Sequence, residues 1–389
     1  MRDFRVVGAV ALALLTGCGG GGGGGPVPTP SSAPGGGRAD VYFSIVVPAG
    51  PPASNGLRRP NYVSSNTQSL SVSVNGGSAQ VFGLTPSSNP NCSTSGSATV
   101  CSNLHAVAPP GTDTFVFTLY QQATPLPPTP TVLSIASVNN QVVQLGVNNQ
   151  LGTFTLNPVI GSVAFSITAP GGGFQPGTPS SGNALNFTVK DPSGATIIAP
   201  GIYVDSTDTA LPIALTSTQS AFTFSVDSGA SAATGSLNGP SDTATLGYSG
   251  ASVASTTTIK AAAGGISATQ TIAALTAPIV VNLSSSASGN DYHITTAPPE
   301  LDFYGTGISG TAALSESGYA GSFTLQSTTC GTWLSFSPTV GQTSTSFTAN
   351  ALAAGTTGTP AICTATFGDT NGQTITVTFT VTTISFGLQ

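Results

Sequence analysis

Short runs of alternating apolar and hydroxyl-bearing residues constrain this sequence more than any other feature. Residues 69–74 (SLSVSV) and 115–119 (FVFTL) are two of many such runs, and Gly, Pro, Asn and Asp separate them. Successive side chains of a strand point to opposite faces, so a period of two places the apolar ones on one side. No long stretch shows the helical spacing, and glutamate occurs only at Glu300 and Glu316. We therefore predict an all-β fold of sandwich or barrel type.

The composition limits the classes of function. Charged residues make up 5% of the chain, against about 25% in typical domains, and the formal net charge is −6. Arg58-Arg59 is the only basic pair. Nucleic-acid binding needs several Lys or Arg side chains against phosphates, so we exclude a nucleic-acid partner. Apolar residues form 39% of the chain, which is more than a disordered body would carry.

Three successive β bodies are expected from the runs and their spacing. The first covers residues 40–158, the second residues 159–285 and the third residues 286–389. Expected strands of the first body are residues 41–47, 70–74, 79–82, 115–119, 132–135, 141–147 and 152–156, with a hairpin turn at 75–77. Those of the second are residues 162–168, 184–190, 196–199, 201–204, 213–215, 221–226, 244–247, 256–261 and 268–272. Those of the third are residues 301–303, 323–325, 333–336, 346–348, 363–367 and 375–381.

The second and third bodies resemble bacterial immunoglobulin-like domains of the invasin and surface-repeat type. The motif Leu246-Gly247-Tyr248-Ser249-Gly250 followed by 257–261 (TTIKA) looks like the last two strands of such a domain. The turn Asp369-Thr370-Asn371-Gly372 before a Thr/Val-rich strand looks like the end of another. The resemblance implies tandem Ig-like β-sandwiches. Trp333 lies only three residues after Cys330, so the antibody arrangement of tryptophan and cysteine is not expected.

The N-terminus reads as an export signal. A short charged start (MRDFR) precedes an apolar run over 6–15, which is too short to cross a bilayer as a helix. Leu15-Thr16-Gly17-Cys18 resembles the lipobox of bacterial lipoproteins. That resemblance implies that residues 1–17 are removed and that Cys18 carries the lipid that attaches the chain to a membrane. An ordinary signal peptide with an incidental cysteine is the alternative.

Residues 18–39 are expected to form a disordered linker. Seven glycines run from Gly19 to Gly25, and a Pro- and Ser-rich stretch follows. The residue after Cys18 is Gly19 rather than Asp. In enteric lipoproteins Asp at this place retains the protein in the inner membrane, so the resemblance leaves the outer membrane or the cell surface as the expected location.

Four further cysteines are expected to form two disulfides, because the count is even and the protein is exported. Proximity in the chain favours Cys92–Cys101, closing a loop, and Cys330–Cys363. A metal site is the competing interpretation. Neither pair has CxxC spacing, and His105 beside Cys101 would still leave a fourth ligand missing. No metal and no cofactor are expected.

No catalytic constellation is evident. His105 and His293 fall in different bodies, and no G-x-S-x-G motif occurs. Asp205, Asp208 and Asp369 are expected to be turn residues; the Asp369 turn starts like a calcium loop, but no glutamate follows it.

Three functions remain as hypotheses. The first is a non-enzymatic lipoprotein that acts as a structural or adhesive surface module with a protein or glycan partner. The second is a carbohydrate-binding module with a platform of exposed tyrosines. The third is an enzyme, which would gather Glu300, Glu316, Asp302 and His293 in one cleft.

Overall fold

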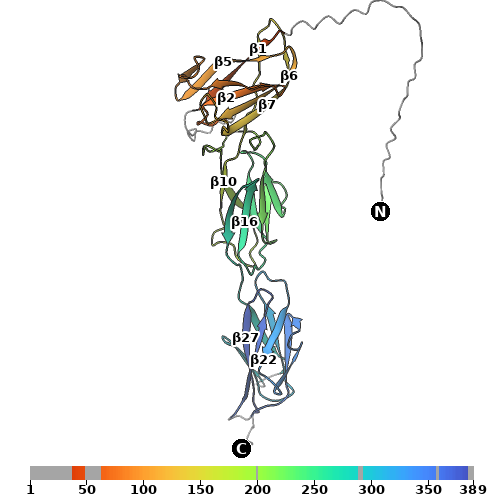
Figure 1. Cartoon of the computed structure of the whole chain (residues 1–389). Helices are drawn as coiled ribbons and strands as arrows, with labels where there is room; N and C mark the ends of the chain where they lie inside the picture. Colours follow the sequence, from red (N-terminus) through yellow and green to blue (C-terminus); the bar gives the residue numbers. More distant parts are fainter. Residues whose placement is uncertain (1–36, 49–62, 199, 288–291, 356–358, 384–389) are drawn as a thin grey trace, which may run out of the picture.

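The computed structural model describes residues 37–48, 63–198, 200–287, 292–355 and 359–383. These residues form twenty-seven strands and no helix, so the all-β prediction is confirmed. None of the described segments is a helix long and apolar enough to cross a bilayer. The strands build three two-sheet sandwiches that follow one another end to end (Figure 1). We call them the first, second and third sandwich. Cys18, the signal segment and nearly all of the predicted linker lie outside the described residues.

The first sandwich surrounds a core that includes Phe43 and Phe117, whose rings meet edge to face with centroids 5.2 Å apart. One sheet has the order β4-β5-β1-β8. Its strands are β4 (Cys92–Ser95), β5 (Ala98–Ala108), β1 (Ala39–Val47) and β8 (Asn149–Gln150). The other has the order β3-β2-β6-β7-β9, formed by β3 (Gln80–Gly83), β2 (Ser69–Val74), β6 (Gly111–Tyr120), β7 (Val132–Val143) and β9 (Asn157–Pro158).

The second sandwich packs Phe222, Phe224, Leu246 and Tyr248 into one core. Its first sheet has the order β10-β11-β15-β13 and its second the order β14-β12-β16-β17. The strands are β10 (Ser162–Ile167), β11 (Ser180–Lys190), β12 (Ile213–Ser217), β13 (Phe222–Val226), β14 (Thr234–Leu237), β15 (Ala244–Tyr248), β16 (Thr257–Ala263) and β17 (Ile266–Ile272). Alternate residues of β15 and β16 are buried, as the sequence pattern predicts.

The third sandwich has a core rich in phenylalanine, including Phe303, Phe347, Phe367 and Phe379. Its sheets have the orders β18-β21-β25-β23 and β19-β20-β27-β26-β22-β24. The strands are β18 (Val280–Ser285), β19 (Tyr292–Thr296), β20 (Pro299–Phe303), β21 (Ser309–Ser315), β22 (Phe323–Thr328), β23 (Leu334–Ser337), β24 (Thr343–Ser344), β25 (Ser346–Ala351), β26 (Ala361–Gly368) and β27 (Thr374–Val381).

The second and third sandwiches share one strand order, and it is that of an immunoglobulin fold. In the second, β10, β11, β15 and β13 stand side by side as A-B-E-D, and β12, β16 and β17 as C-F-G. In the third, β18, β21, β25 and β23 repeat A-B-E-D, and β22, β26 and β27 repeat C-F-G. Both add a short strand beside C, and the third also adds the β19–β20 hairpin, with β20 parallel to β27. The first sandwich has a different order.

Several sequence predictions are wrong in detail. Residues 92–101 form a β4–β5 hairpin instead of a closed loop. Residues 152–156 form no strand. The described residues 196–198 and 201–204 contribute only isolated bridges, at Thr196 and Val204, and residue 199 lies outside the described residues. Residues 280–285, placed at the end of the second body, pair with β21 and pack into the third core instead. Every second residue of this edge strand is half-buried and the others are exposed. The alternation of apolar and polar residues therefore indicated the strand only weakly.

Candidate functional site: an outer sheet face and two junctions

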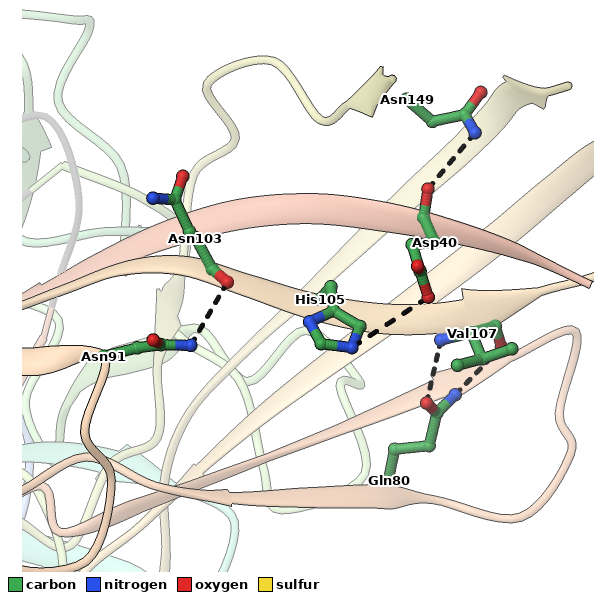
Figure 2. Close-up of polar contacts among 7 residues, drawn as sticks. All are labelled: Asp40, Gln80, Asn91, Asn103, His105, Val107 and Asn149. Atoms are coloured by element: carbon green, nitrogen blue, oxygen red, sulfur yellow. Dashed lines mark hydrogen bonds and ion pairs between the residues drawn. The ribbon is translucent and has the colours of Figure 1, made fainter. Parts of the chain in front are cut away.

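One exposed face of the first sandwich collects polar and aromatic side chains. Asp40, Tyr42, His105 and Gln150 project from β1, β5 and β8 on the side opposite the core. We call this set the outer face. Tyr42 pairs with His105 on one side and with Gln150 on the other. The Tyr42 and His105 rings have centroids 5.6 Å apart. His105 Nε2 lies 3.9 Å from Asp40 Oδ1 (Figure 2).

The ionisable side chains of the outer face are open to solvent. The side chains of His105 and Asp40 are about half exposed, at 49% and 50%. Water screens charges in such a position, so neither group is held in the low-dielectric environment that catalysis uses. A flat aromatic ring beside hydrogen-bonding side chains can instead stack and bond against a polar ligand.

Side chains from neighbouring segments complete the open edge of β5 beside this face. β4 pairs with β5 only up to Cys101. Beyond it, the Gln80 amide donates to Val107 O at 3.0 Å and accepts from Val107 N at 2.8 Å (Figure 2). Asn91 Nδ2 donates to Asn103 O at 3.4 Å. Gln80 therefore bonds to Val107 as a strand residue would.

Three of the four residues proposed for an enzyme lie on one face of the β19–β20 hairpin, and Glu316 lies elsewhere. His293 Nδ1 lies 3.5 Å from Asp302 Oδ2 across the β19–β20 pair. Glu300 accepts a hydrogen bond from the Thr380 hydroxyl at 3.1 Å. Glu316 has different partners, Ser252 and Asp369. In the part of the chain that the structure describes, no three His, Cys, Asp or Glu side chains come together as a metal site would require.

Both cysteine pairs are bonded as the sequence favours. Cys92 is joined to Cys101, and Cys330 to Cys363. The first bond links paired residues of the β4–β5 hairpin, and the second joins the loop after β22 to β26 inside the third core.

The described tyrosines do not form the exposed platform that the carbohydrate-binding hypothesis requires. Tyr203 and Tyr248 are buried, and the Tyr248 hydroxyl donates to Ala251 O. The other described tyrosines are half-buried. Tyr120 and Tyr319 use their hydroxyls inside their own sandwiches, on Ser71 and on Ser322 O respectively. Tyr62 lies outside the described residues.

The first junction, between the first and second sandwiches, is apolar at its centre. Ile135, Val159 and Val204 form a separate buried cluster, with Val116 and Val132 packed against it. Val159 N donates to Leu133 O in the first sandwich, and Val204 N donates to Pro158 O. The connecting segment is thus bonded to both of its neighbours.

Side-chain hydrogen bonds surround this centre, and one of them has a carboxyl acceptor. The Ser193 hydroxyl contacts the Ser64 hydroxyl at 3.3 Å and accepts from Asn66 Nδ2 at 3.0 Å. Ser137 Oγ donates to Asp208 Oδ2 at 2.7 Å. Ser193 and Asp208 both lie in the loop between strands B and C of the second sandwich.

Aspartates shape the turns that carry these contacts, as the sequence predicts. Asp191 Oδ1 accepts from Ser193 N and Ala195 N. Asp205 Oδ1 accepts from Thr207 and Thr209 in the same pattern, and the hydrogen bond from the Thr207 hydroxyl, followed by those from the two amides, lowers the pKa of Asp205. Asp369 repeats this turn in the third sandwich. Each is a turn in which a carboxylate replaces a backbone acceptor.

The second junction, between the second and third sandwiches, brings bare backbone into contact. Ser252 N donates to Gly318 O at 2.8 Å, and Ser317 Oγ donates to Pro176 O at 2.9 Å. A Cβ atom on Gly318 would lie 2.2 Å from Gly250 O, and one on Gly177 would lie 1.9 Å from Ser317 Oγ. Both glycines have φ of +77°, so each is required for space and for conformation.

A carboxyl group crosses the second junction. Ser252 Oγ donates to Glu316 Oε1 at 2.8 Å, and the Asp369 carboxyl is near enough to Glu316 to affect its charge. Glu316 lies in the B–C loop of the third sandwich, as Ser193 does in the second. Sequence reasoning missed the role of both junctions. The sequence offered one weak indication of the second junction: Glu316 is one of only two glutamates and directly follows a strand.

Comparisons with known proteins give the fold little further detail. No family model and no curated protein matches the chain. Among solved structures, it is similar to domains 4–9 of the surface layer protein SbsC, with 14% identity over 81% of this chain and 39% of that one, and a TM-score of 0.20.

Two further structures are similar at the same low level. The N-terminal eight Ig domains of Down Syndrome Cell Adhesion Molecule isoform 1.30.30 share 10% identity over 89% of this chain and 36% of that one, with a TM-score of 0.21. SGBP-B of the Bacteroides ovatus mixed-linkage glucan utilization locus, in complex with a mixed-linkage heptasaccharide, shares 12% identity over 88% and 70%, with a TM-score of 0.13. This chain spans well under half of the first two proteins. All three TM-scores are below 0.5, so these likenesses carry no functional argument.

Proposed function

We propose that this protein is a non-enzymatic lipoprotein of the bacterial cell envelope whose three sandwiches act as a surface spacer of structural or adhesive type. The observation that carries the proposal is that both junctions are interlocked by contacts from each side. The connecting segment is bonded to both of its neighbours, through Val159 N to Leu133 O and through Pro158 O to Val204 N. Ser252 and Ser317 bond across the second junction. Neighbouring domains move relative to one another by default, and contacts of this kind restrict that motion.

The proposed anchor is a lipid on Cys18, which rests on the lipobox resemblance alone. Export and membrane attachment would place the third sandwich at the end farthest from the membrane. Metabolic labelling with a fatty-acid analogue tests the anchor: we expect label and membrane recovery in the native protein, and loss of both in Cys18→Ala. A labelled Cys18→Ala protein would contradict the anchor.

Surface location needs a separate test, because an anchored lipoprotein can face either side of the outer membrane. Protease added to intact cells should digest the third sandwich. A protein that is cut only after the outer membrane is opened would refute the surface proposal while leaving the spacer intact.

The non-enzymatic part rests on how the acidic side chains are used. Asp191, Asp205 and Asp369 bond to the amides of their own turns, and Asp302 pairs with an exposed histidine. A hydrolase screen tests it. Turnover that disappears in His293→Ala or Asp302→Asn, with the fold retained, would overturn this part.

A carbohydrate-binding role is the second candidate, and the outer face favours it. Tyr42 stands between His105 and Gln150, so a ring is flanked by hydrogen-bonding groups on adjacent strands. We expect a glycan array to give a signal that Tyr42→Ala removes. Tyr304→Ala, which alters another half-buried tyrosine in the third sandwich, is the matched control. No signal for the native protein would rule this role out.

A further inference from the structure

Two buried carboxyl groups meet at the second junction without a donor between them. Glu316 is 6% exposed and Asp369 is 8% exposed. Glu316 Oε1 accepts from Ser252, and Asp369 Oδ1 accepts from the amides of Asn371 and Gln373. The other two oxygens, Glu316 Oε2 and Asp369 Oδ2, are buried and have no hydrogen-bond partner.

One proton satisfies both remaining oxygens. If Glu316 carries it on Oε2, that hydroxyl can donate to Asp369 Oδ2, while Oε1 still accepts from Ser252. Two ionised carboxylates in the same place would repel each other and would each leave a buried acceptor unpaired. The arrangement is therefore complete with one shared proton and strained without it.

We propose that a proton shared by Glu316 and Asp369 stabilises the second junction, and that loss of this proton allows the second and third sandwiches to separate. This inference concerns the joint itself and is independent of where the protein is attached. It makes the chain a rod with one joint whose stiffness depends on pH.

The charges around the pair support this dependence. Burial, followed by the neighbouring Asp369 carboxyl, raises the pKa of Glu316 above its ordinary value of 4.5, against the hydrogen bond from Ser252, which lowers it. The second sandwich faces Glu316 with Ser252 and the Ala277 backbone, which do not titrate. From the third sandwich come Asp369 and, next to its turn, Tyr319, whose hydroxyl contacts Thr370.

The direction of the effect follows from linkage. The closed junction binds the proton more tightly than the open one, in which water reaches both carboxyl groups. Stability of the junction is therefore full below the ordinary pKa and is lost as the pH rises through the raised pKa of Glu316. The closing equilibrium should fall roughly tenfold for each pH unit in that interval and then level off.

The proton on Glu316 can be observed directly. With selective carbon-13 labelling of the glutamate carboxyl groups, the full mature chain gives two signals, because only Glu300 and Glu316 are glutamates. Glu316→Gln assigns them. We expect the Glu316 signal to titrate above the ordinary range; titration at the ordinary value would overturn the proposal.

Amide hydrogen exchange reports whether the junction is closed. Ser252 N bonds across it to Gly318 O, whereas Val253 N bonds to Leu275 O within the second sandwich. The protection of the Ser252 amide, corrected for the intrinsic exchange rate, should fall as the pH rises. This fall should stop at the titration midpoint of Glu316. The protection of the Val253 amide should stay constant. Constant protection of Ser252 across this interval would overturn the proposal.

Two variants separate the proton from a general structural role. The Glu316→Gln amide can donate to Asp369 and accept from Ser252, and Asp369→Asn keeps the turn acceptor and adds a donor toward Glu316. Both should hold Ser252 protected at every pH, and Asp205→Asn, in an equivalent turn without a facing carboxyl group, should leave the pH dependence unchanged. If millimolar Ca²⁺ restored protection at high pH in the native chain but not in Glu316→Gln, a cation site would replace the shared proton.

Discussion

The first junction joins aliphatic, hydroxyl and amide groups and one carboxyl group that is open to solvent, whereas the second joins bare backbone and two buried carboxyl groups. In both, the B–C loop of the later sandwich reaches back to the earlier one, through Ser193 in one case and Glu316 in the other. The loops are equivalent in the fold, but their side chains are not. Equivalent loops therefore place a buried pair of carboxyl groups at one joint and none at the other, and the proposed response to pH depends on that difference. The topology decides where neighbouring sandwiches meet, and a few loop residues decide under which conditions they stay together.

We expect the largest effect from removing a disulfide. It shows which unfolding transition belongs to which sandwich, and a comparison of the junctions needs that assignment. Removing the Cys330–Cys363 bond should cost about 4 kcal/mol in the free energy of unfolding of the third sandwich, and removing Cys92–Cys101 about 3 kcal/mol in the first. Trp333 is the only tryptophan and lies in the third sandwich. Its fluorescence should report the first change but not the second. A Trp333 transition that shifted equally in both variants would show that the sandwiches unfold together.

Breaking the apolar centre should separate the first junction. Val204 is fully buried there, and Val204→Asp would place a charge without a partner among aliphatic side chains. We expect a loss of about 3 kcal/mol, measured by calorimetry of the full chain. Ile202→Asp is the control, because Ile202 is 46% exposed two residues away. Equal losses in both variants would mean that the cluster contributes nothing specific.

The second junction should be sensitive to a single methyl group. Gly318→Ala meets Gly250 O and also forces an unfavourable φ, so we expect a loss of about 2 kcal/mol. Gly372→Ala has a φ of +84° but open space around it, and should lose about 1 kcal/mol. The difference between them, measured by denaturant unfolding, is the contribution of the backbone contact. No difference would show that the sandwiches do not touch there.

The smallest expected effect concerns the hydroxyl of the first junction. Ser193→Ala removes the contacts with Ser64 and Asn66 and should lose about 1 kcal/mol. Thr207→Ala removes a similar hydroxyl bond within the Asp205 turn, without a partner from the first sandwich. It should cost less in the same thermal unfolding measurement. Unlike the second junction, this contact should not change between pH 5 and 8, since the partners from the first sandwich, Ser64 and Asn66, do not titrate.

Local patterns predicted the local structure well. The hairpin turn at Asn75-Gly76 has the positive φ values that these residues tolerate. Each disulfide joins two cysteines that follow one another in the sequence of cysteines. Strand β14 was missed because Gly235 interrupts it and Leu237 is its one buried residue. Residues 152–156 alternate as a strand would, yet they pack Leu156 and Phe154 against the first core without a ladder.

The junctions were beyond prediction because they depend on which loops meet. A turn such as Asp191 to Gly194 is recognisable from its residues, but its docking on Ser64 and Asn66 spans more than a hundred positions. Likewise, Glu316 and Asp369 are 53 residues apart and meet only after the B–C and F–G loops have been placed at one end of the third sandwich. When two residues from distant loops are buried against each other, no repeating pattern in the sequence indicates it.

The side chain of Gln80 affects how readily the protein aggregates at high concentration. An exposed strand edge is a template on which another chain can add a strand and start an aggregate. By occupying the N–H and C=O of Val107, Gln80 leaves no such template at that position. A chain with so few charges has little electrostatic repulsion to keep its copies apart. We therefore expect Gln80→Ala to shorten the time before concentrated protein turns cloudy, long before it alters the melting of the fold.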